Sequence, residues 1–468
     1  MSSLTTGGSI GLARPLSDAA TSTVQTSAIA ARLERLPLTS YQRGIFAIIA
    51  TAWFFDSMDL GALTFVLGPI KQSFGLSTAQ AGLLSSMSFL GMFIGAASAG
   101  MLADRFGRTR VFQVSMIFWG VGSILCGLAP SLETLAAARV LLGFGMGMEF
   151  PVAQSMVSEI IPAKQRGRYI ALLEGFWPLG FIASGLLCYA VLSFADWRWV
   201  FILQGIPAIF VLIVRRYVPE SPRWVAAHGD AAGADRVMSE IEAKVSQRLN
   251  GAALPAPEPQ FVEVQRTRGL ATLFAPGYAR RTVMLWSLWF FALLGFYGLT
   301  TWLGALLQAK GFPVTKSVFY TILISLAGIP GFLTAAWLIE RLGRKPTLIG
   351  ALLGAAIASY FYGGATSQTQ LIVAGLCMQF CAFGMWSALY AYTPELYPTH
   401  VRATGTGFAS AIGRIGSLIG PSLIGFILPV AGQSGVFALG AGAFALAALV
   451  VFTLGEETRG RTLESISH

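Results

Sequence analysis

The sequence is poor in charged residues and in histidine. Charged side chains make up 12% of its 468 residues, against roughly 25% in a soluble domain. Its three histidines, His228, His400 and His468, all lie outside the long apolar segments. The sequence also has no phosphate-binding loop and no Ser/His/Asp set of the kind that catalysis uses. We therefore expect no enzyme, no catalytic residue and no cofactor.

Cysteine is equally scarce and gives no metal site. The four cysteines, Cys126, Cys188, Cys377 and Cys381, all fall inside apolar segments. Cys377 and Cys381 share one helical face, but two thiols with no third Cys or His nearby are a poor metal site. We interpret all four as packing residues.

Apolar residues dominate what is present. They make up 54% of the chain, and the mean hydropathy is +0.66. A bilayer core needs about 20 mostly apolar residues per helix. We identify twelve such stretches, six before residue 219 and six after residue 280. The fold class predicted is an all-α membrane protein with twelve transmembrane helices; a large soluble helical protein would need polar faces that these segments lack.

The two halves of the chain repeat each other. Asp104-Arg105-Phe106-Gly107-Arg108 returns as Glu340-Arg341-Leu342-Gly343-Arg344, and residue numbers 104 and 340 differ by 236. Glu159 and Glu395 differ by the same 236, as do Glu220 and Glu456. Parallel repeats in a hydrophobic chain are one way to build a secondary transporter around a central site.

The net charge of +10 follows membrane topology. Basic residues gather in the loops after the second, fourth and eighth stretches, for example Arg105, Lys164 and Arg341, and few lie in the opposite loops. By the positive-inside rule, both termini are cytoplasmic. The expected partner of this surface is a lipid bilayer, and no nucleic-acid partner is expected.

These patterns divide the chain into five parts. We expect a disordered cytoplasmic tail over 1–40, a six-helix bundle over 41–218 and a second bundle over 281–455. Between the bundles, 219–280 is predicted to be a cytoplasmic loop with a short helix over 231–249 and a Pro-rich linker. A short cytoplasmic tail over 456–468 ends the chain, which we expect to be a monomer.

The loop segments resemble a known superfamily. Gly100-x3-Asp104-Arg105-x-Gly107-Arg108, its second copy and Pro219-Glu220-Ser221-Pro222-Arg223 resemble the signatures of the major facilitator superfamily, in its sugar-porter-like branch. The resemblance covers residues 40–460 and implies two six-helix bundles around a midplane cavity that opens to each side in turn.

Charged residues at the cytoplasmic helix ends are candidates for an inner gate. Acidic and basic side chains there can pair across helices when the gate is shut and separate when it opens. The alternative is that the arginines serve only as topology anchors. The gate candidates are Asp104, Arg108, Glu159, Arg166, Glu340, Arg344, Glu395 and Arg402.

Ionisable residues inside the apolar stretches are few, and such residues are costly and usually functional. Asp56 lies about 18 Å into the first stretch at 1.5 Å per residue, and Asp59 lies one turn further. Glu149 is midway along the fourth stretch. Carboxylates so close in a low dielectric can hold and release a proton near neutral pH, so Asp56, Asp59 and Glu149 are candidates for proton coupling. For Asp59, as for Glu174 in the fifth stretch, a helix–helix hydrogen bond is an equal alternative.

Arg414 indicates the cargo. It lies about 17 Å into the eleventh stretch, and because a guanidinium stays charged it must meet a carboxylate of the protein or of a substrate. Aromatic residues near it in the pattern are Trp177, Tyr297, Trp302, Trp386 and Tyr390. Single rings in such helices are more often packing residues, but several rings with one buried cation suit a small planar anion.

A closer resemblance agrees with this. Phe55-Asp56-Ser57-Met58-Asp59-Leu60-Gly61, Leu172-Leu173-Glu174-Gly175-Phe176-Trp177, Leu389-Tyr390-Ala391-Tyr392-Thr393-Pro394-Glu395 and Gly413-Arg414-Ile415-Gly416 resemble the bacterial niacin transporters, which are similar to the synaptic vesicle glycoprotein 2 family. The resemblance implies nicotinate as cargo, with Arg414 for its carboxylate and Trp177, Trp302 and Tyr390 for its ring. The chain departs from the group at Gly175, where we expect serine.

Three functions remain open from the sequence. The first is an importer of a small aromatic acid, with nicotinate before a benzoate-like acid, either coupled to protons or facilitative. The second is a sugar carrier, which fits the loop signatures but leaves Arg414 without a purpose. The third is a protein of transporter fold that binds a ligand without moving it.

Overall fold

The described part of the chain is helical. The computed structural model describes residues 27–257, 273–275, 278–397 and 399–459, without the side chains of Lys164 and residues 399–403. The first half contains α2 (Ser40–Phe74), α3 (Thr78–Phe106), α4 (Arg108–Leu128), α5 (Leu132–Ile160), α6 (Ala163–Val191), α7 (Trp197–Gly205), η1 (Ile206–Phe210) and α8 (Val211–Tyr217). Two short helices follow, α9 (Pro222–Ala227) and α10 (Ala231–Arg248). The second half contains α11 (Ala279–Ala309), α12 (Val314–Leu326), α13 (Gly328–Leu342), α14 (Arg344–Gly363), α15 (Gln368–Glu395) and α16 (Thr399–Leu454).

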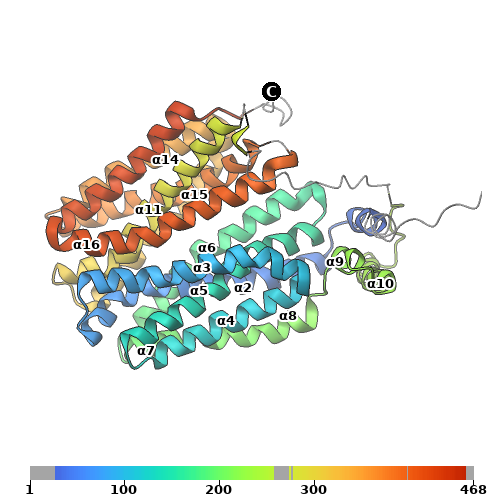
Figure 1. Ribbon diagram of the computed structural model, residues 1–468, viewed down its shortest axis with the longest axis horizontal. Helices are drawn as coiled ribbons and strands as arrows, with labels where there is room; N and C mark the ends of the chain where they lie inside the picture. The colour runs from blue at the N-terminus through green and yellow to red at the C-terminus, as the bar shows by residue number, and fades with distance from the viewer. Residues whose placement is uncertain (1–26, 258–272, 276–277, 398, 460–468) are drawn as a thin grey trace, which may run out of the picture.

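These helices form two bundles that lie side by side (Figure 1). Within the described residues, eleven helices are long and apolar enough to cross a membrane. The last of them, α16, is a pair of helices joined at Gly432, whose φ of 62° and ψ of −169° break the helix. Counting that pair as two spans gives the twelve that the sequence predicts, six in each half.

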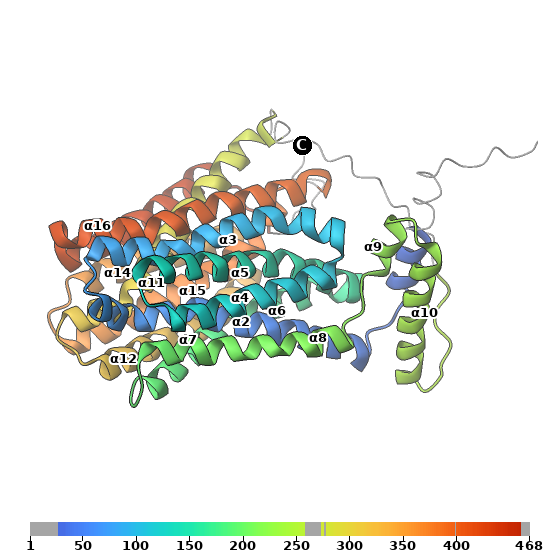
Figure 2. The same cartoon turned by 60° about the horizontal axis from the view of Figure 1, so that its bottom comes forward.

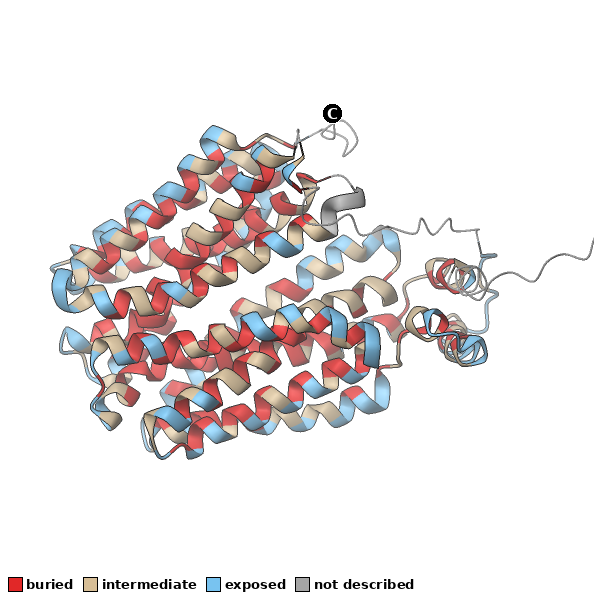
Figure 3. Ribbon diagram, viewed as in Figure 1, coloured by how far each residue is buried: buried red, intermediate tan, exposed pale blue. Residues whose placement is uncertain are grey.

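Burial follows the bundle geometry. Figure 3 shows buried residues where helices face one another and exposed residues on the outer faces of both bundles. Many of the outward residues are large and apolar, such as Ile209, Leu333 and Phe452, each more than 60% exposed. Such a surface suits lipid as solvent. The fold therefore agrees with the prediction of a membrane protein.

Each half contains the same tight connection between its second and third spans. Gly107 and Gly343 have positive φ values of 100° and 110°, a conformation that favours glycine. In the first half, the carboxylate of Glu220 accepts hydrogen bonds from the backbone N–H groups of Arg108 and Thr109 at 2.9 and 3.1 Å. In the second half, Glu457 accepts from the backbone N–H groups at the start of α14, both at 3.0 Å.

These two caps show that the third sequence repeat is shifted by one residue in the structure. The sequence repeat aligns Glu220 with Glu456, but it is Glu457 that caps the helix in the second half, as Glu220 does in the first. Glu456 instead accepts a hydrogen bond from Arg281 at 3.0 Å. A carboxylate at a helix N-terminus is favoured by the helix dipole and by the free N–H groups there, so each cap ties the end of its six-helix unit to the unit's interior.

The two halves meet closely at the end far from α9 and α10. A Cβ added to Gly82 on α3 would lie 2.7 Å from the carbonyl oxygen of Pro421 on α16. One added to Gly304 on α11 would lie 2.5 Å from the carbonyl oxygen of Thr64 on α2. The hydroxyls of Ser86 and Ser422 are hydrogen-bonded across the same seam at 2.6 Å. The glycines therefore allow backbone-to-backbone contact between the halves.

The segment before α2 departs from the predicted disordered tail. Residues 27–34 are helical, and this helix lies beside α10 at one end of the molecule (Figure 2). Ile29, Leu33 and Leu36 are buried against Met238 and Ile241 of α10. These apolar positions are three and four residues apart, the spacing of an amphipathic helix, but the segment is too short for this pattern to stand out in the sequence. Residues 1–26 of the expected tail and 258–272 of the expected cytoplasmic loop lie outside the described residues.

We predict that Gly82→Val prevents the halves from closing at this seam, because the added methyl groups would overlap the backbone of α16. In a background without Cys377 and Cys381, spin labels at the exposed Gln72 and Val430, one on each half at this end, should report a longer distance in the variant. Gly350→Val is the matched control, since nothing lies within 4 Å of a Cβ at Gly350. An unchanged distance distribution for Gly82→Val would contradict the role of the seam.

Candidate functional site

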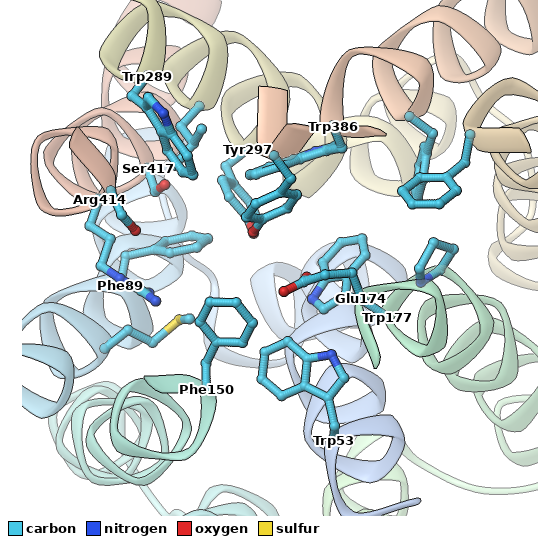
Figure 4. A pocket seen from close by; sticks show the side chains of 17 residues that line it. Trp53, Phe89, Phe150, Glu174, Trp177, Trp289, Tyr297, Trp386, Arg414 and Ser417 are labelled. Atoms are coloured by element: carbon cyan, nitrogen blue, oxygen red, sulfur yellow. The ribbon is translucent and has the colours of Figure 1, made fainter. Parts of the chain in front are cut away.

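A cavity of about 750 Å³, including the part that is open to solvent, lies between the two halves. Its walls come from α2, α3, α5 and α6 of the first half and from α11, α13, α15 and α16 of the second. Figure 4 shows the side chains that surround it. They are mainly aromatic or aliphatic, and among the described lining residues those with charged groups are Glu174 and Arg414.

Arg414 projects from α16 into this cavity (Figure 4). Ser410 and Ser417, one turn before and after it on the same helix, also line the wall. Arg414 has no hydrogen bond or ion pair with any residue that the structure describes. A guanidinium offers five N–H donors in a planar fork that fits a carboxylate. The cavity therefore holds an available cation, as the sequence predicts for an anionic cargo.

The aromatic wall is formed by stacked and edge-on rings of the second half. Trp386 and Tyr390 on α15 stack at 5.5 Å with an interplanar angle of 25°. Tyr297 meets Trp386 edge-on at 6.2 Å. Trp177 of the first half lies 6.0 Å from Phe383 and closes the wall opposite. Four of the five predicted ring-binding residues, Trp177, Tyr297, Trp386 and Tyr390, thus line one cavity.

Trp302 is the fifth, and it is not among the lining residues. Its side chain is 1% exposed, and its indole N–H donates to the carbonyl oxygen of Pro421 at 3.0 Å. The geometry gives Trp302 a packing role between α11 and α16 and does not support contact with a ligand. The sequence shows that Trp302 lies in an apolar span, but it does not show which face of α11 points into the cavity. It therefore cannot distinguish a packing residue from a ligand-binding one.

Other lining residues were not foreseen. Trp53 and Phe150 of the first half are 4.8 Å apart, and Trp289 lies 5.7 Å from Tyr390. Trp289 is two helical turns before Tyr297, so the periodicity of α11 could have indicated that both face the cavity. Glu174 also lines the wall. From the sequence alone, a place on the cavity wall and a helix–helix hydrogen bond are equally compatible with this residue.

The three candidate proton carriers are buried beside the cavity, outside its lining. Asp56, Asp59 and Glu149 are each at most 2% exposed. Asp56 is within electrostatic range of Glu149, Asp59 and Arg414. Its Oδ1 has no hydrogen-bond partner among the described residues. The first half thus contains a group of carboxyl groups that reaches towards the cavity cation.

Asp59 and Glu149 are each held by one polar neighbour. Asp59 accepts a hydrogen bond from Ser123 at 3.0 Å, and Glu149 accepts one from the indole of Trp119 at 2.7 Å. In both carboxyl groups the other oxygen is buried without a partner in the described part. Asp59 therefore makes the helix–helix hydrogen bond that the sequence analysis left open, through one of its oxygens. Its other oxygen has no partner among the described residues.

Arg139 is a further charge near this group. Its guanidinium is fully buried and lies 5.5 Å from the ring of Phe201. It is within electrostatic range of Asp59, yet its nitrogens make no hydrogen bond with described residues. Arg139 also lines a second cavity of about 330 Å³, with Thr64 and Thr301 on its wall.

Most of the predicted gate residues pair within their own half. Arg108 forms an ion pair with Glu159 in the first half. In the second half, Arg344 binds Glu395 at 3.0 Å and Glu340 at 3.5 Å. No ion pair between described residues joins one half to the other. The pairs match the sequence repeat, and their use as a gate stays a prediction.

The remaining gate candidates have other contacts. The backbone carbonyl of Asp104 accepts a hydrogen bond from the indole of Trp224 at 2.7 Å. Arg166 binds Glu34, which precedes α2, at 2.6 Å. Glu34 also binds Arg223 of α9 at 3.1 Å. The sequence did not point to Glu34 because the composition of its segment predicts disorder. The side chain of Arg402 lies outside the described residues.

Comparisons with known proteins agree with this architecture. Residues 21–468 match the family described as "Sugar (and other) transporter". The niacin transporter NiaP of Acinetobacter baylyi is 37% identical over 439 residues, 94% of this chain and 99% of that protein. The putative niacin/nicotinamide transporter NiaP of Bacillus subtilis is 35% identical over 424 residues, 90% of this chain and 98% of that protein. The synaptic vesicle 2-related protein of Bos taurus is 29% identical over 460 residues, 93% of this chain and 82% of that protein.

Among solved structures, the fold resembles the xylose transporter XylE of E. coli in a partially occluded inward open conformation. The TM-score is 0.73 at 19% sequence identity, covering 91% of this chain and all of that one. At this identity the likeness concerns the fold.

We predict that acidification loosens the helix at 27–34 from α9 and α6. Burial alone would raise the pKa of Glu34, but the hydrogen bonds and charges of Arg166 and Arg223 outweigh it and hold this pKa below its usual range. The stabilisation is thus complete above the unfolded value of about 4.3 and is lost as pH falls through the lower folded pKa.

A spin label at the exposed Ala28, in a variant without Cys377 and Cys381, tests this by its mobility as pH falls from 6 to 3. Glu34→Gln should make the label more mobile at pH 6, although Arg32 and Arg35 still bind Glu242 on α10. Glu240→Gln, which removes a carboxylate from the exposed face of α10, should not change the mobility. A label whose mobility at pH 6 is the same in the wild type and in Glu34→Gln would show that the ion pairs of Glu34 do not hold this helix.

Proposed function

The chain belongs to the sugar (and other) transporter family and is a secondary transporter, and on that premise we propose that it imports a small aromatic carboxylate, nicotinate first, by alternating access. The proposal is supported most by Arg414, a permanent cation without a protein partner among the described residues, in a cavity walled by aromatic rings. Nicotinate is a flat ring that carries one carboxylate, so it matches both features. A relative described as a niacin transporter, 37% identical, favours this cargo over other aromatic acids.

A neutral sugar is a poorer match to this cavity. Sugar hydroxyls need several hydrogen-bonding side chains, whereas these walls are mainly aromatic and aliphatic. An uncharged cargo would also leave Arg414 without a counter-charge. The likeness to a xylose transporter concerns the fold, because the identity there is 19%.

Alternating access is supported by the way in which the halves meet. They make backbone contact at the end of Gly82 and Gly304, while no described ion pair joins them at the end of α9 and α10. We propose that the latter end faces the cytoplasm, because the basic loops lie there, and that the chain is a monomer in a bacterial inner membrane with both termini inside. The domain division that the sequence predicts belongs to this proposal.

The charged helix ends then act as the inner gate. In the described state Arg108–Glu159 and Arg344–Glu395 are satisfied within their halves. When the cytoplasmic ends of the bundles approach, these charges come to face one another across the seam, where they can exchange partners. Asp104 and Glu340 occupy equivalent places in the two halves and are the exposed acids available for such an exchange.

Proton coupling through Asp56 completes the proposal. Asp56 lies within electrostatic range of the cargo cation Arg414 and of two further carboxyl groups, Asp59 and Glu149. A proton that enters or leaves this group changes the field at Arg414 and hence its attraction for a carboxylate. Binding of the cargo and binding of the proton are thereby linked.

We predict that Arg414→Ala nearly abolishes nicotinate binding. Removing one partner of a buried, charged hydrogen-bonded pair costs about 2–5 kcal/mol, which is well over tenfold in affinity. Arg414→Lys should recover only part of the affinity, since an ammonium cannot make the bidentate fork. Isothermal titration of the purified protein measures both effects.

Nicotinamide provides the ligand control, because it keeps the ring and loses the charge. The wild type should bind it far more weakly than nicotinate, and Arg414→Ala should bind the two equally poorly. Normal nicotinate binding by Arg414→Ala would mean that the arginine is structural and would remove the basis of the cargo assignment.

We predict that Asp56→Asn keeps nicotinate exchange but loses accumulation. The amide cannot take up a proton, so counterflow in proteoliposomes should persist while uptake driven by a pH gradient disappears. Wild-type uptake that does not respond to an imposed gradient, with or without a protonophore, would exclude the coupling and leave a facilitative carrier.

A further inference from the structure

We propose that Glu174 recognises the ring nitrogen of a pyridine carboxylate and so makes this carrier select nicotinate over benzoate. The inference rests on the proposed function, because it takes Arg414 as the site of the carboxylate. It adds a second anchor on the opposite half of the protein.

Glu174 is placed to reach a ligand. It lies on α6 in the first half and lines the cavity, and Figure 4 shows its carboxyl group directed into the space between Arg414 and the rings. Its Oε1 accepts a hydrogen bond from the Nε2 of Gln154 on α5, at 3.1 Å. Its Oε2 has no hydrogen bond with a described residue, and it is not among the unpartnered polar atoms that are fully enclosed, so it keeps some accessible surface. One oxygen therefore fixes the side chain and the other faces the cavity.

A helix–helix hydrogen bond alone does not account for this arrangement. The bond to Gln154 uses one oxygen, and an amide side chain at position 174 could make it as well. A carboxyl group in a mainly apolar wall costs free energy unless its second oxygen is also satisfied. Among the described residues that line the cavity, Glu174 alone has a carboxyl group. The free oxygen thus points to a polar atom on the cargo.

Glu174 and Arg414 address the cargo from opposite halves. The hydroxyls of Tyr297 and Tyr390 are within electrostatic range of both residues. A ring held among these side chains presents different parts of its edge to the two charged groups. A ligand with a carboxylate at one position and a hydrogen-bonding atom at another fits this layout.

Nicotinate has those two groups and benzoate has only one. The pyridine nitrogen carries a lone pair in the ring plane, two positions from the carbon that bears the carboxylate. It can accept a hydrogen bond from the O–H of a neutral Glu174, or as N–H⁺ it can donate to the ionised carboxylate. Whether the proton resides on Glu174 or on the ring nitrogen, the same two atoms are joined by one hydrogen bond. Benzoate places a C–H group there and leaves the Glu174 oxygen unpaired.

A site built to hydrogen-bond a ligand atom rejects the analogue that lacks it, because its own polar group is left unsatisfied. We therefore expect the wild type to bind nicotinate at least about tenfold more tightly than benzoate. Picolinate and isonicotinate, whose nitrogens lie one position nearer to and further from the carboxylate carbon, should bind more weakly than nicotinate. These four ligands test the proposal on the unaltered protein by isothermal titration.

Variants then assign the effect to Glu174. Glu174→Leu should weaken nicotinate binding about tenfold, leave benzoate binding within about twofold, and so bring the ratio of the two Kd values near one. Glu174→Gln should keep a preference for nicotinate, since its amide can donate to the ring nitrogen. Glu133→Leu and Glu133→Gln are matched controls, because Glu133 is exposed at the start of α5 and far from the cavity lining; they should leave both Kd values unchanged.

The outcomes separate this inference from the proposed function. If the wild type binds nicotinate and benzoate equally and both depend on Arg414, the role of Glu174 is overturned while an aromatic-acid carrier stands. If Glu174→Leu weakens the binding of nicotinate and benzoate by the same factor, Glu174 does not recognise the ring nitrogen. If the wild type binds neither acid, the proposed function itself fails.

Discussion

The charge of Arg414 is the constraint around which the membrane part of this protein is organised. A guanidinium near the centre of a bilayer costs about 2.5–3.5 kcal/mol even on the more lenient insertion scales, and it cannot lower that cost by losing its proton. Here it has no described protein partner and faces a cavity with aromatic walls. Asp56 of the first half is within electrostatic range of Arg414 but forms no ion pair with it. We propose that a transported anion supplies the counter-charge of Arg414.

The helices around this cation form two units, and the charged contacts lie within each unit. Glu220 and Glu457 tie the same turn in each half, and the ion pairs of Arg108 and Arg344 stay inside their own halves. Between the halves, the seam at Gly82 and Gly304 depends on close backbone packing and a pair of serine hydroxyls. Contacts of this kind are individually weak and reversible, so the strong interactions preserve each bundle and the weak ones allow the seam to open.

A sequence pattern is most informative where a single side chain has a high free-energy cost in its surroundings. Asp56, Glu149 and Arg414 were recognised because an ionisable group in an apolar span is expensive wherever its helix packs, and all three lie at or beside the cavity. Aromatic residues carry no such signal. Trp177 and Trp302 have the same chemistry, yet one lines the cavity and the other packs against Pro421. The short helix at 27–34 was missed for a related reason, since its stability comes from packing on α10 more than from its own length.

The sequence by itself determined the twelve spans, the internal repeat and the presence of a buried cation. These are properties of local composition, because hydrophobic length and charge act on each segment separately. Only the tertiary structure decided which face of each helix looks into the cavity, that Glu174 stands opposite Arg414, and that Glu457 rather than Glu456 caps α14. Those outcomes depend on the rotation and register of one helix against another. They arise from packing between residues hundreds of positions apart, which local pattern does not encode.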